Sequence, residues 1–201
     1  NDGFDDLIIG APGADANGEE SGSSYVILGG NFLINEPVIL GTPGDDHLIG
    51  QNSADRFVAG DGNDLLIGRG GADVFQGGAG DDYIRVGNLD FVQVDGGDGE
   101  DILGLGNKDL NLDLASAAGK ISGIETIFLY GTGDNTLTLT ATDVINLSDS
   151  SNTLTVKGDA GDRIMGLASG WQDGGINGNL HAFTSGEAIL LVGLNVVTDF
   201  I

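Results

Sequence analysis

Five aspartates recur at intervals of nine residues in the first half of the chain. Each is followed two positions later by a large apolar residue, and glycines crowd the four positions before it, as in GTPGDDHLI and GGAGDDYIR. A carboxylate is a hard oxygen ligand of the type that calcium takes, and glycine permits turns that bring backbone carbonyls close to an ion. A helix, with about 3.6 residues per turn, does not explain a constant spacing of nine. The aspartates are Asp46, Asp55, Asp64, Asp73 and Asp82, and their apolar followers are Leu48, Phe57, Leu66, Phe75 and Ile84.

This pattern resembles GGxGxDxUx, the calcium-binding nonapeptide of the RTX (haemolysin-type) repeat proteins. The resemblance implies that the first six residues of each unit form a turn, that the last three form a short strand, and that two units make one coil. It therefore implies an all-β fold, a right-handed parallel β-roll or β-solenoid stabilised by several calcium ions. The apolar followers would point inward, because side chains alternate along a strand.

Successive turns of such a coil lie on alternate sides, so two ligand-bearing edges are expected. Asp46, Asp64 and Asp82 would share one edge, and Asp55 and Asp73 would share the other. We predict ions between Asp46 and Asp64, between Asp64 and Asp82, and between Asp55 and Asp73, with backbone carbonyls completing each shell.

The next good unit, GGDGEDILG, places Asp101 one residue out of frame. Asp101 remains a candidate ligand, and we read the preceding stretch as a degenerate turn with one inserted residue, where calcium dependence weakens. A core only one side chain deep buries too little to offset a backbone entropy of about 1–2 kcal/mol per residue. Calcium binding is therefore expected to be part of folding.

Residues 1–33 form a different segment, which resembles part of an FG-GAP repeat, one blade of the integrin-α type of propeller. In that repeat an acidic calcium loop precedes the phrase D-L-x-x-G-A-P and a later G-x-x-Y-V strand. The resemblance implies extra N-terminal strands at 7–9 and 25–28 and makes Asp2 and Asp6 candidate metal ligands. The matching positions are Asp2, Gly3, Asp6, Leu7, Gly10, Ala11, Pro12, Gly22, Tyr25 and Val26.

We assign residues 34–104 to the calcium-binding roll and residues 105–201 to a β-solenoid-like continuation. The latter is rich in period-2 runs, and the stretches that begin at Asn135 (NTLTLTATDVINL) and Asn152 (NTLTVKGDAGDRIMGL) form a weak internal repeat. We predict that this repeat corresponds to one two-strand coil, and that the later coils are longer and less dependent on calcium. Only LDLASAAGKI carries a helix signal. This segment also resembles the region after the nonapeptides in large bacterial RTX adhesins.

The charge is strongly acidic: 31 acidic residues against 7 basic ones give a formal net charge of −24. This balance excludes a nucleic-acid partner, which requires a basic footprint, and favours cations. No apolar run reaches the roughly 18 residues of a membrane span. Cysteine is absent. With the RTX resemblance, these features predict an extracellular or cell-surface protein that a bacterium of the Gram-negative type exports by type I secretion.

No arrangement of residues predicts catalysis. His47 and His181 have no triad-like neighbours, and Trp171 is interpreted as a core or cap residue. The leading reading is a non-enzymatic structural or adhesive module. One alternative is a filament subunit joined head-to-tail by β-strand donation, a homopolymer. Another is the calcium-folding, secretion-directing tail of a secreted hydrolase.

Overall fold

The computed structural model describes residues 7–11, 23–27, 38–148 and 151–201. Two compact units are present, Asn1–Asn35 and Glu36–Ile201. In the first unit, β1 (Leu7–Ala11) pairs antiparallel with β2 (Ser23–Ile27), with Ile9 opposite Tyr25. The expected N-terminal strands are therefore present and pair with each other. Asp2 and Asp6 lie outside the described residues.

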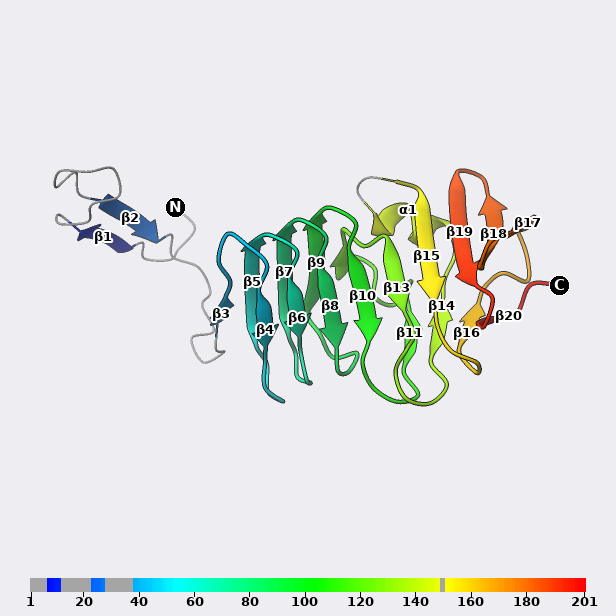
Figure 1. Ribbon diagram of the computed structural model, residues 1–201, viewed down its shortest axis with the longest axis horizontal. Helices are drawn as coiled ribbons and strands as arrows, with labels where there is room; N and C mark the ends of the chain where they lie inside the picture. The colour runs from blue at the N-terminus through cyan, green and yellow to red at the C-terminus, as the bar shows by residue number, and fades with distance from the viewer. Residues whose placement is uncertain (1–6, 12–22, 28–37, 149–150) are drawn as a thin grey trace. The chain divides into compact units, whose positions relative to one another are not determined.

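The second unit is a solenoid of parallel strands, as predicted (Figure 1). Its first coils alternate between two sheets. The first sheet contains, in spatial order, β17 (Gln172–Asn177), β18 (Leu180–Ser185), β19 (Ala188–Gly193), β15 (Thr153–Lys157), β13 (Thr126–Phe128), β10 (Ile102–Leu105), β8 (Tyr83–Val86), β6 (Leu65–Ile67) and β4 (His47–Ile49). The second sheet contains β12 (Ile121–Ser122), β9 (Gln93–Asp98), β7 (Val74–Ala79), β5 (Arg56–Asp61) and β3 (Val38–Leu40).

The register of these sheets follows the nonapeptide pairs. Arg56 pairs with Val74 and His47 with Leu65, one coil apart in each sheet. The predicted insertion is also present, because Val74 pairs with Gln93 and Tyr83 with Ile102, each one residue further on. The extra residue is absorbed in the turn between β8 and β9, and both sheets continue past it.

The apolar followers of the aspartates are buried, as predicted. Phe57, Leu66, Phe75 and Ile84 are fully buried, and Leu48, in the first coil, is 8% exposed. Phe57 and Phe75 stack with ring centroids 4.8 Å apart, and parallel stacking of this kind contributes beyond the buried area alone. These inward residues, joined by Ala59 in β5 and Val86 in β8, thus form a continuous core along the coils.

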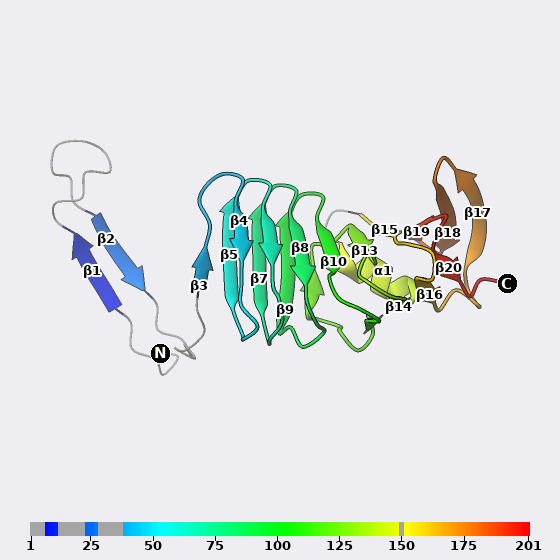
Figure 2. The ribbon, with the colours of Figure 1, turned by 60° about the horizontal axis from the view of Figure 1, so that its bottom comes forward.

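After β10 the coil becomes longer and acquires a third side (Figure 2). The third sheet has the order β11 (Asn111–Asp113), β14 (Thr136–Thr138), β16 (Arg163–Met165) and β20 (Val197–Thr198). Longer late coils were predicted, but the internal repeat at Asn135 and Asn152 was misread. The first copy forms β14 in the third sheet, whereas the second forms β15 in the first sheet, so the copies are not stacked.

One helix was missed. α1 (Ala141–Leu147) occupies part of the stretch predicted to be a two-strand coil. Its N-terminus is a capping box, in which the Thr140 hydroxyl accepts from the Asp143 N–H and the Asp143 carboxylate accepts from the Thr140 N–H. The helix contacts β12, the last strand of the second sheet, and the Ile124 N–H donates to the Leu147 carbonyl. α1 therefore covers an edge that would otherwise be open. The LDLASAAGKI segment forms hydrogen-bonded turns and no α-helix.

The first sheet ends in an antiparallel hairpin, since β17 pairs with β18 and β18 with β19. Trp171, just before this hairpin, is buried at 8% exposure, in agreement with a core or cap role. Among the described residues, no helix is long and apolar enough to cross a membrane.

Candidate metal-binding edges

Four turns lie on one side of the roll, which we call the first edge: residues 41–46, 59–64, 77–82 and 96–101. Each ends in an aspartate, and each aspartate from the second coil onward accepts through Oδ1 from the N–H of the aspartate one coil earlier. The separations are 18, 18 and 19 residues and the distance is 2.8 Å each time, for the pairs Asp46–Asp64, Asp64–Asp82 and Asp82–Asp101. The ladder continues to Glu125, which accepts from the Asp101 N–H at 2.8 Å.

The opposite side, which we call the second edge, contains the turns 50–55 and 68–73. The Asp55 N–H donates to Asp73 Oδ1 at 2.9 Å, across 18 residues. The ladder ends there, because the next coil places Val92 at the aspartate position and its N–H donates to the Asp73 carbonyl. The predicted division into two edges is thus observed, with Asp101 added to the first.

The aspartate side chains are buried at an energetic cost. Asp64, Asp82 and Asp101 are at most 2% exposed, and their Oδ2 atoms have no hydrogen-bond partner; the same is true of Asp55 Oδ1. Burial, together with the charge of the neighbouring carboxylates, raises the pKa of Asp82 to about 6 and that of Asp101 to about 7. Burial likewise raises the pKa of Asp64. An unpaired buried carboxylate is unfavourable unless a cation or a proton neutralises it.

The space beside these carboxylates is kept open by glycine. A Cβ added at Gly77 would meet Asp82 Oδ2 and the Gly96 carbonyl, and a Cβ at Gly96 would meet Asp101 Oδ2 and the Gly123 carbonyl. Carbonyls and carboxylates thus converge within van der Waals reach of a single atom. Among the described residues, no three His, Cys, Asp or Glu side chains gather as a metal cluster. An ion here would therefore take one or two carboxylates and several backbone carbonyls, the oxygen set that calcium accepts.

A second oxygen ladder was missed from the sequence. It occupies the residue just before each first-edge aspartate. Asp45 accepts from the Asn63 N–H, Asn63 from the Asp81 N–H, and Asp81 from the Glu100 N–H, at 2.8–2.9 Å. The signal was available: this position carries Asp, Asn, Asp and Glu on the first edge but Ala54 and Ala72 on the second.

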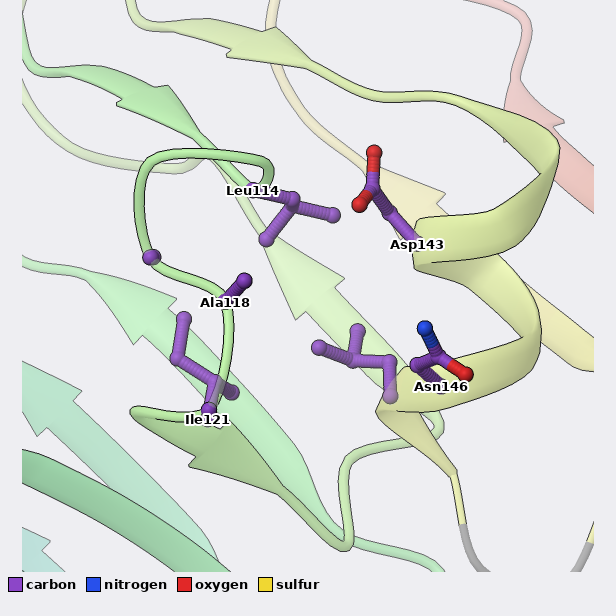
Figure 3. A pocket seen from close by; sticks show the side chains of 8 residues that line it. Leu114, Ala118, Ile121, Asp143 and Asn146 are labelled. Carbon is purple, nitrogen blue, oxygen red and sulfur yellow. The ribbon is translucent and has the colours of Figure 1, made fainter.

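The other sites considered in the sequence have no comparable geometry. His47 is exposed, and His181 Nε2 lies 2.7 Å from Asp173 Oδ1 in the C-terminal hairpin, where hydrogen bonds lower the pKa of Asp173. A small recess lies between α1 and the turn that precedes Ile121 (Figure 3). Its carboxylate, Asp143, is engaged in the capping box.

Comparisons with known families agree with this geometry. Residues 38–66 and 58–90 match the RTX calcium-binding nonapeptide repeat (4 copies), and residues 1–27 match the FG-GAP repeat. No curated protein sequence matches the chain at a significant level. The nonapeptide repeat is a structural calcium-binding unit and not a catalytic one, so residues 38–90 form a Ca²⁺-binding module of the kind found in secreted proteins. Asp101 and Glu125 lie beyond the matched residues but extend the same ladder.

Proposed function

We propose that the chain is a non-enzymatic structural module of an exported bacterial protein. Its β-roll folds when it binds calcium outside the cell. The observation that carries the proposal is the row of buried carboxylate oxygens without a hydrogen-bond partner at Asp64, Asp82 and Asp101. These oxygens point to a cation, because the first edge supplies no other neutralising group within hydrogen-bond reach.

Calcium would act as a folding switch. The metal-free roll must bury several like charges over a core one side chain deep, so its folded state is unfavourable. Ions that bind only the folded roll stabilise it by mass action. Extracellular calcium modules work in the range of about 10⁻⁴–10⁻³ M, so the chain would pass through a calcium-poor cytoplasm unfolded and fold after export.

A calcium titration of the full chain tests this function. We expect the β signal in circular dichroism to rise cooperatively with calcium and to fall again when EDTA is added in excess. Magnesium at the same concentration is the control, since it demands a tighter octahedral shell and dehydrates reluctantly. Identical spectra in EDTA and in calcium would overturn the proposal.

We further propose an adhesive or assembling role outside the cell. One observation supports assembly: β17 is the last strand of the first sheet, and all its residues are exposed. An open edge strand is a template for another chain, and we propose that β1 or β2 of a second copy is the strand that adds to it. Light scattering during the same titration measures this, and a chain that stays monomeric at saturating calcium would count against assembly.

A further inference from the structure

We propose that this chain binds calcium along the first edge only, with one ion each at Asp64, Asp82 and Asp101, while the turns of the second edge close on their own backbone without metal. This inference rests on the calcium function proposed above and goes beyond it, because it separates turns that share one repeat pattern.

The conformation of the second residue in each turn separates the two kinds. At the three turns that end in orphaned carboxylates, this residue is a glycine in the positive-φ region: Gly60 at 115°, Gly78 at 121° and Gly97 at 104°. Side-chain-bearing residues resist these angles. The second-edge turns have Gln51 and Arg69 at this position, and neither has a positive φ.

In two of the three turns that lack that glycine, the turn supplies its own donor to the carboxylate. The Gln51 N–H donates to Asp55 Oδ2 at 2.6 Å. The first turn of the roll, which has Thr42 in place of glycine, behaves in the same way, since the Thr42 N–H donates to Asp46 Oδ2 at 2.5 Å. In the glycine-bearing turns the corresponding Oδ2 atoms of Asp64, Asp82 and Asp101 receive no donor. The residue four positions before the aspartate therefore decides whether the Oδ2 atom of that aspartate is available to a cation.

Carbonyl alignment distinguishes the edges as well. The strands that lead into the three glycine-bearing turns, β5, β7 and β9, have six residues each and remain paired into the turn, with Gly60 beside Gly78 and Gly78 beside Gly97. A Cβ at Gly78 would collide with the Gly60 carbonyl, and one at Gly97 with the Gly78 carbonyl. A row of carbonyl oxygens thus runs along this edge. β4 and β6, which lead into the second edge, have three residues each and end before the turn.

The acidic residues at the fifth turn position add to the difference. Asp45, Asp81 and Glu100 increase the negative charge beside the first edge, whereas Ala54 and Ala72 add none beside the second. Divalent cations are drawn to the more negative edge.

Asp55 Oδ1 is also without a partner, but its position differs from that of the three Oδ2 atoms. It corresponds to Asp73 Oδ1, which accepts the N–H of the aspartate one coil earlier. Asp55 is the first aspartate of the second edge, so there is no aspartate one coil earlier to donate an N–H to it. The orphaned atom thus marks the start of the second-edge ladder and not an ion.

Matched variants test the inference by calorimetric titration of the full chain with calcium. Asp82→Asn and Asp73→Asn are isosteric changes at the same repeat position, both in buried side chains. We expect Asp82→Asn to bind one calcium ion fewer than the parent chain and Asp73→Asn to bind the same number. Any ion held by Asp2 and Asp6 contributes equally to all three and cancels. Circular dichroism at saturating calcium identifies the variants that remain folded.

A crystal grown in calcium gives a second readout that needs no variant, because anomalous scattering locates the ions. Ions at Asp64, Asp82 and Asp101 alone would support the inference. An ion between Asp55 and Asp73, or the loss of one ion in Asp73→Asn, would overturn it while leaving the calcium function intact. A chain that binds no calcium at all would overturn both.

Discussion

The calcium-binding roll and the C-terminal coils stack polar side chains in the same way but satisfy them differently. In the roll, each first-edge aspartate from Asp64 onward accepts one N–H from the previous coil, and its second oxygen has no donor. In the third sheet the equivalent positions are Asn135 and Asp162, and there every hydrogen-bonding group has a partner. The Asn135 amide accepts from the Leu110 N–H and donates to the Leu129 carbonyl, and the Asp162 carboxylate accepts from the N–H groups of Asn135 and Asp159.

Because of this difference we expect the roll to depend on calcium and its continuation to depend on it less. The ladder itself requires no ion, since an amide or a doubly hydrogen-bonded carboxylate can occupy the rung. We propose that an ion binds where the turn withdraws the second donor. The C-terminal coils also have a third sheet and a helix around their core, so their apolar side chains are enclosed on more sides.

Removal of calcium should produce the largest contrast between the two regions. In EDTA we expect the amides of residues 38–104 to lose protection from hydrogen exchange, because the roll has a thin core and unpaired buried carboxylates. The amides of β14, β15 and β16 should retain most of theirs. Exchange followed by mass spectrometry measures both in one sample, with the calcium-loaded chain as reference. Equal loss in both regions would contradict the comparison.

Acid should partly replace calcium in the metal-free chain. The folded pKa values of Asp82 and Asp101, about 6 and about 7, lie above the value of 3.8 expected for the unfolded chain. The folded state therefore binds more protons, and its stability falls as the pH rises from about 4 to about 7. We expect more β structure at pH 5 than at pH 8 after calcium has been removed by dialysis. At subsaturating calcium the trend should reverse, because protons compete for the same oxygens. A pH-independent signal in calcium-free buffer would contradict the assignment.

Asn135→Leu should destabilise the C-terminal coils whether or not calcium is present. The variant leaves the half-buried Leu110 N–H without its acceptor, at about 1–3 kcal/mol, and removes one of the two donors to the Leu129 carbonyl, which still accepts from the Gly131 N–H. Urea unfolding at saturating calcium gives the loss of free energy. The matched variant on the roll, Asp82→Asn, should instead raise the calcium concentration needed for folding. If Asn135→Leu also strongly raised the calcium concentration at the midpoint of folding, the two regions would fold as a single cooperative unit.

Thr140→Ala should have the smallest effect. It removes the N-cap of α1 and leaves the Asp143 N–H without its hydroxyl acceptor, a change that typically costs about 1 kcal/mol. Thermal unfolding with calcium bound would show it as a modest decrease in midpoint. Thr138→Ala, in the preceding strand, is a nearby control that leaves the cap intact. A larger decrease in the unfolding midpoint for Thr140→Ala than for Thr138→Ala would be due to the loss of the helix cap.

The sequence predicts the roll well because its signals are local and repeated. Glycines and aspartates fix the turn, the apolar follower fixes the inward face, and the one-residue slip before Asp101 is visible in the spacing. The later coils lack regularly spaced glycines and aspartates that would mark their turns. The alternating runs at Asn135 and Asn152 have similar sequences but belong to different sheets. Packing between residues far apart in the sequence decides which strands become neighbours. α1 was missed although Thr140 and Asp143 form the S/T-x-x-D/E signature of a helix start.

The difference between the edges could also have been read from the second and fifth turn positions. The aspartates and their followers recur every nine residues, which makes all units look alike. Thr42, Gln51 and Arg69 depart from glycine at the second position, and Ala54 and Ala72 depart from an acidic or amide residue at the fifth. These departures matter because they change whether each carboxylate oxygen has a hydrogen-bond donor. The presence of that donor depends on the backbone conformation of the turn.

The pairing of every turn with the one a full coil away sets the step by which such a molecule can change length. Duplication of one 18-residue coil would add a rung of about 4.8 Å to each sheet and leave every later residue on the edge it already occupies. Duplication of a single nonapeptide would move all later turns to the opposite edge and place the ion-binding turns above the self-closed ones. Growth by gene duplication is therefore tolerable in pairs of repeats and disruptive in single ones.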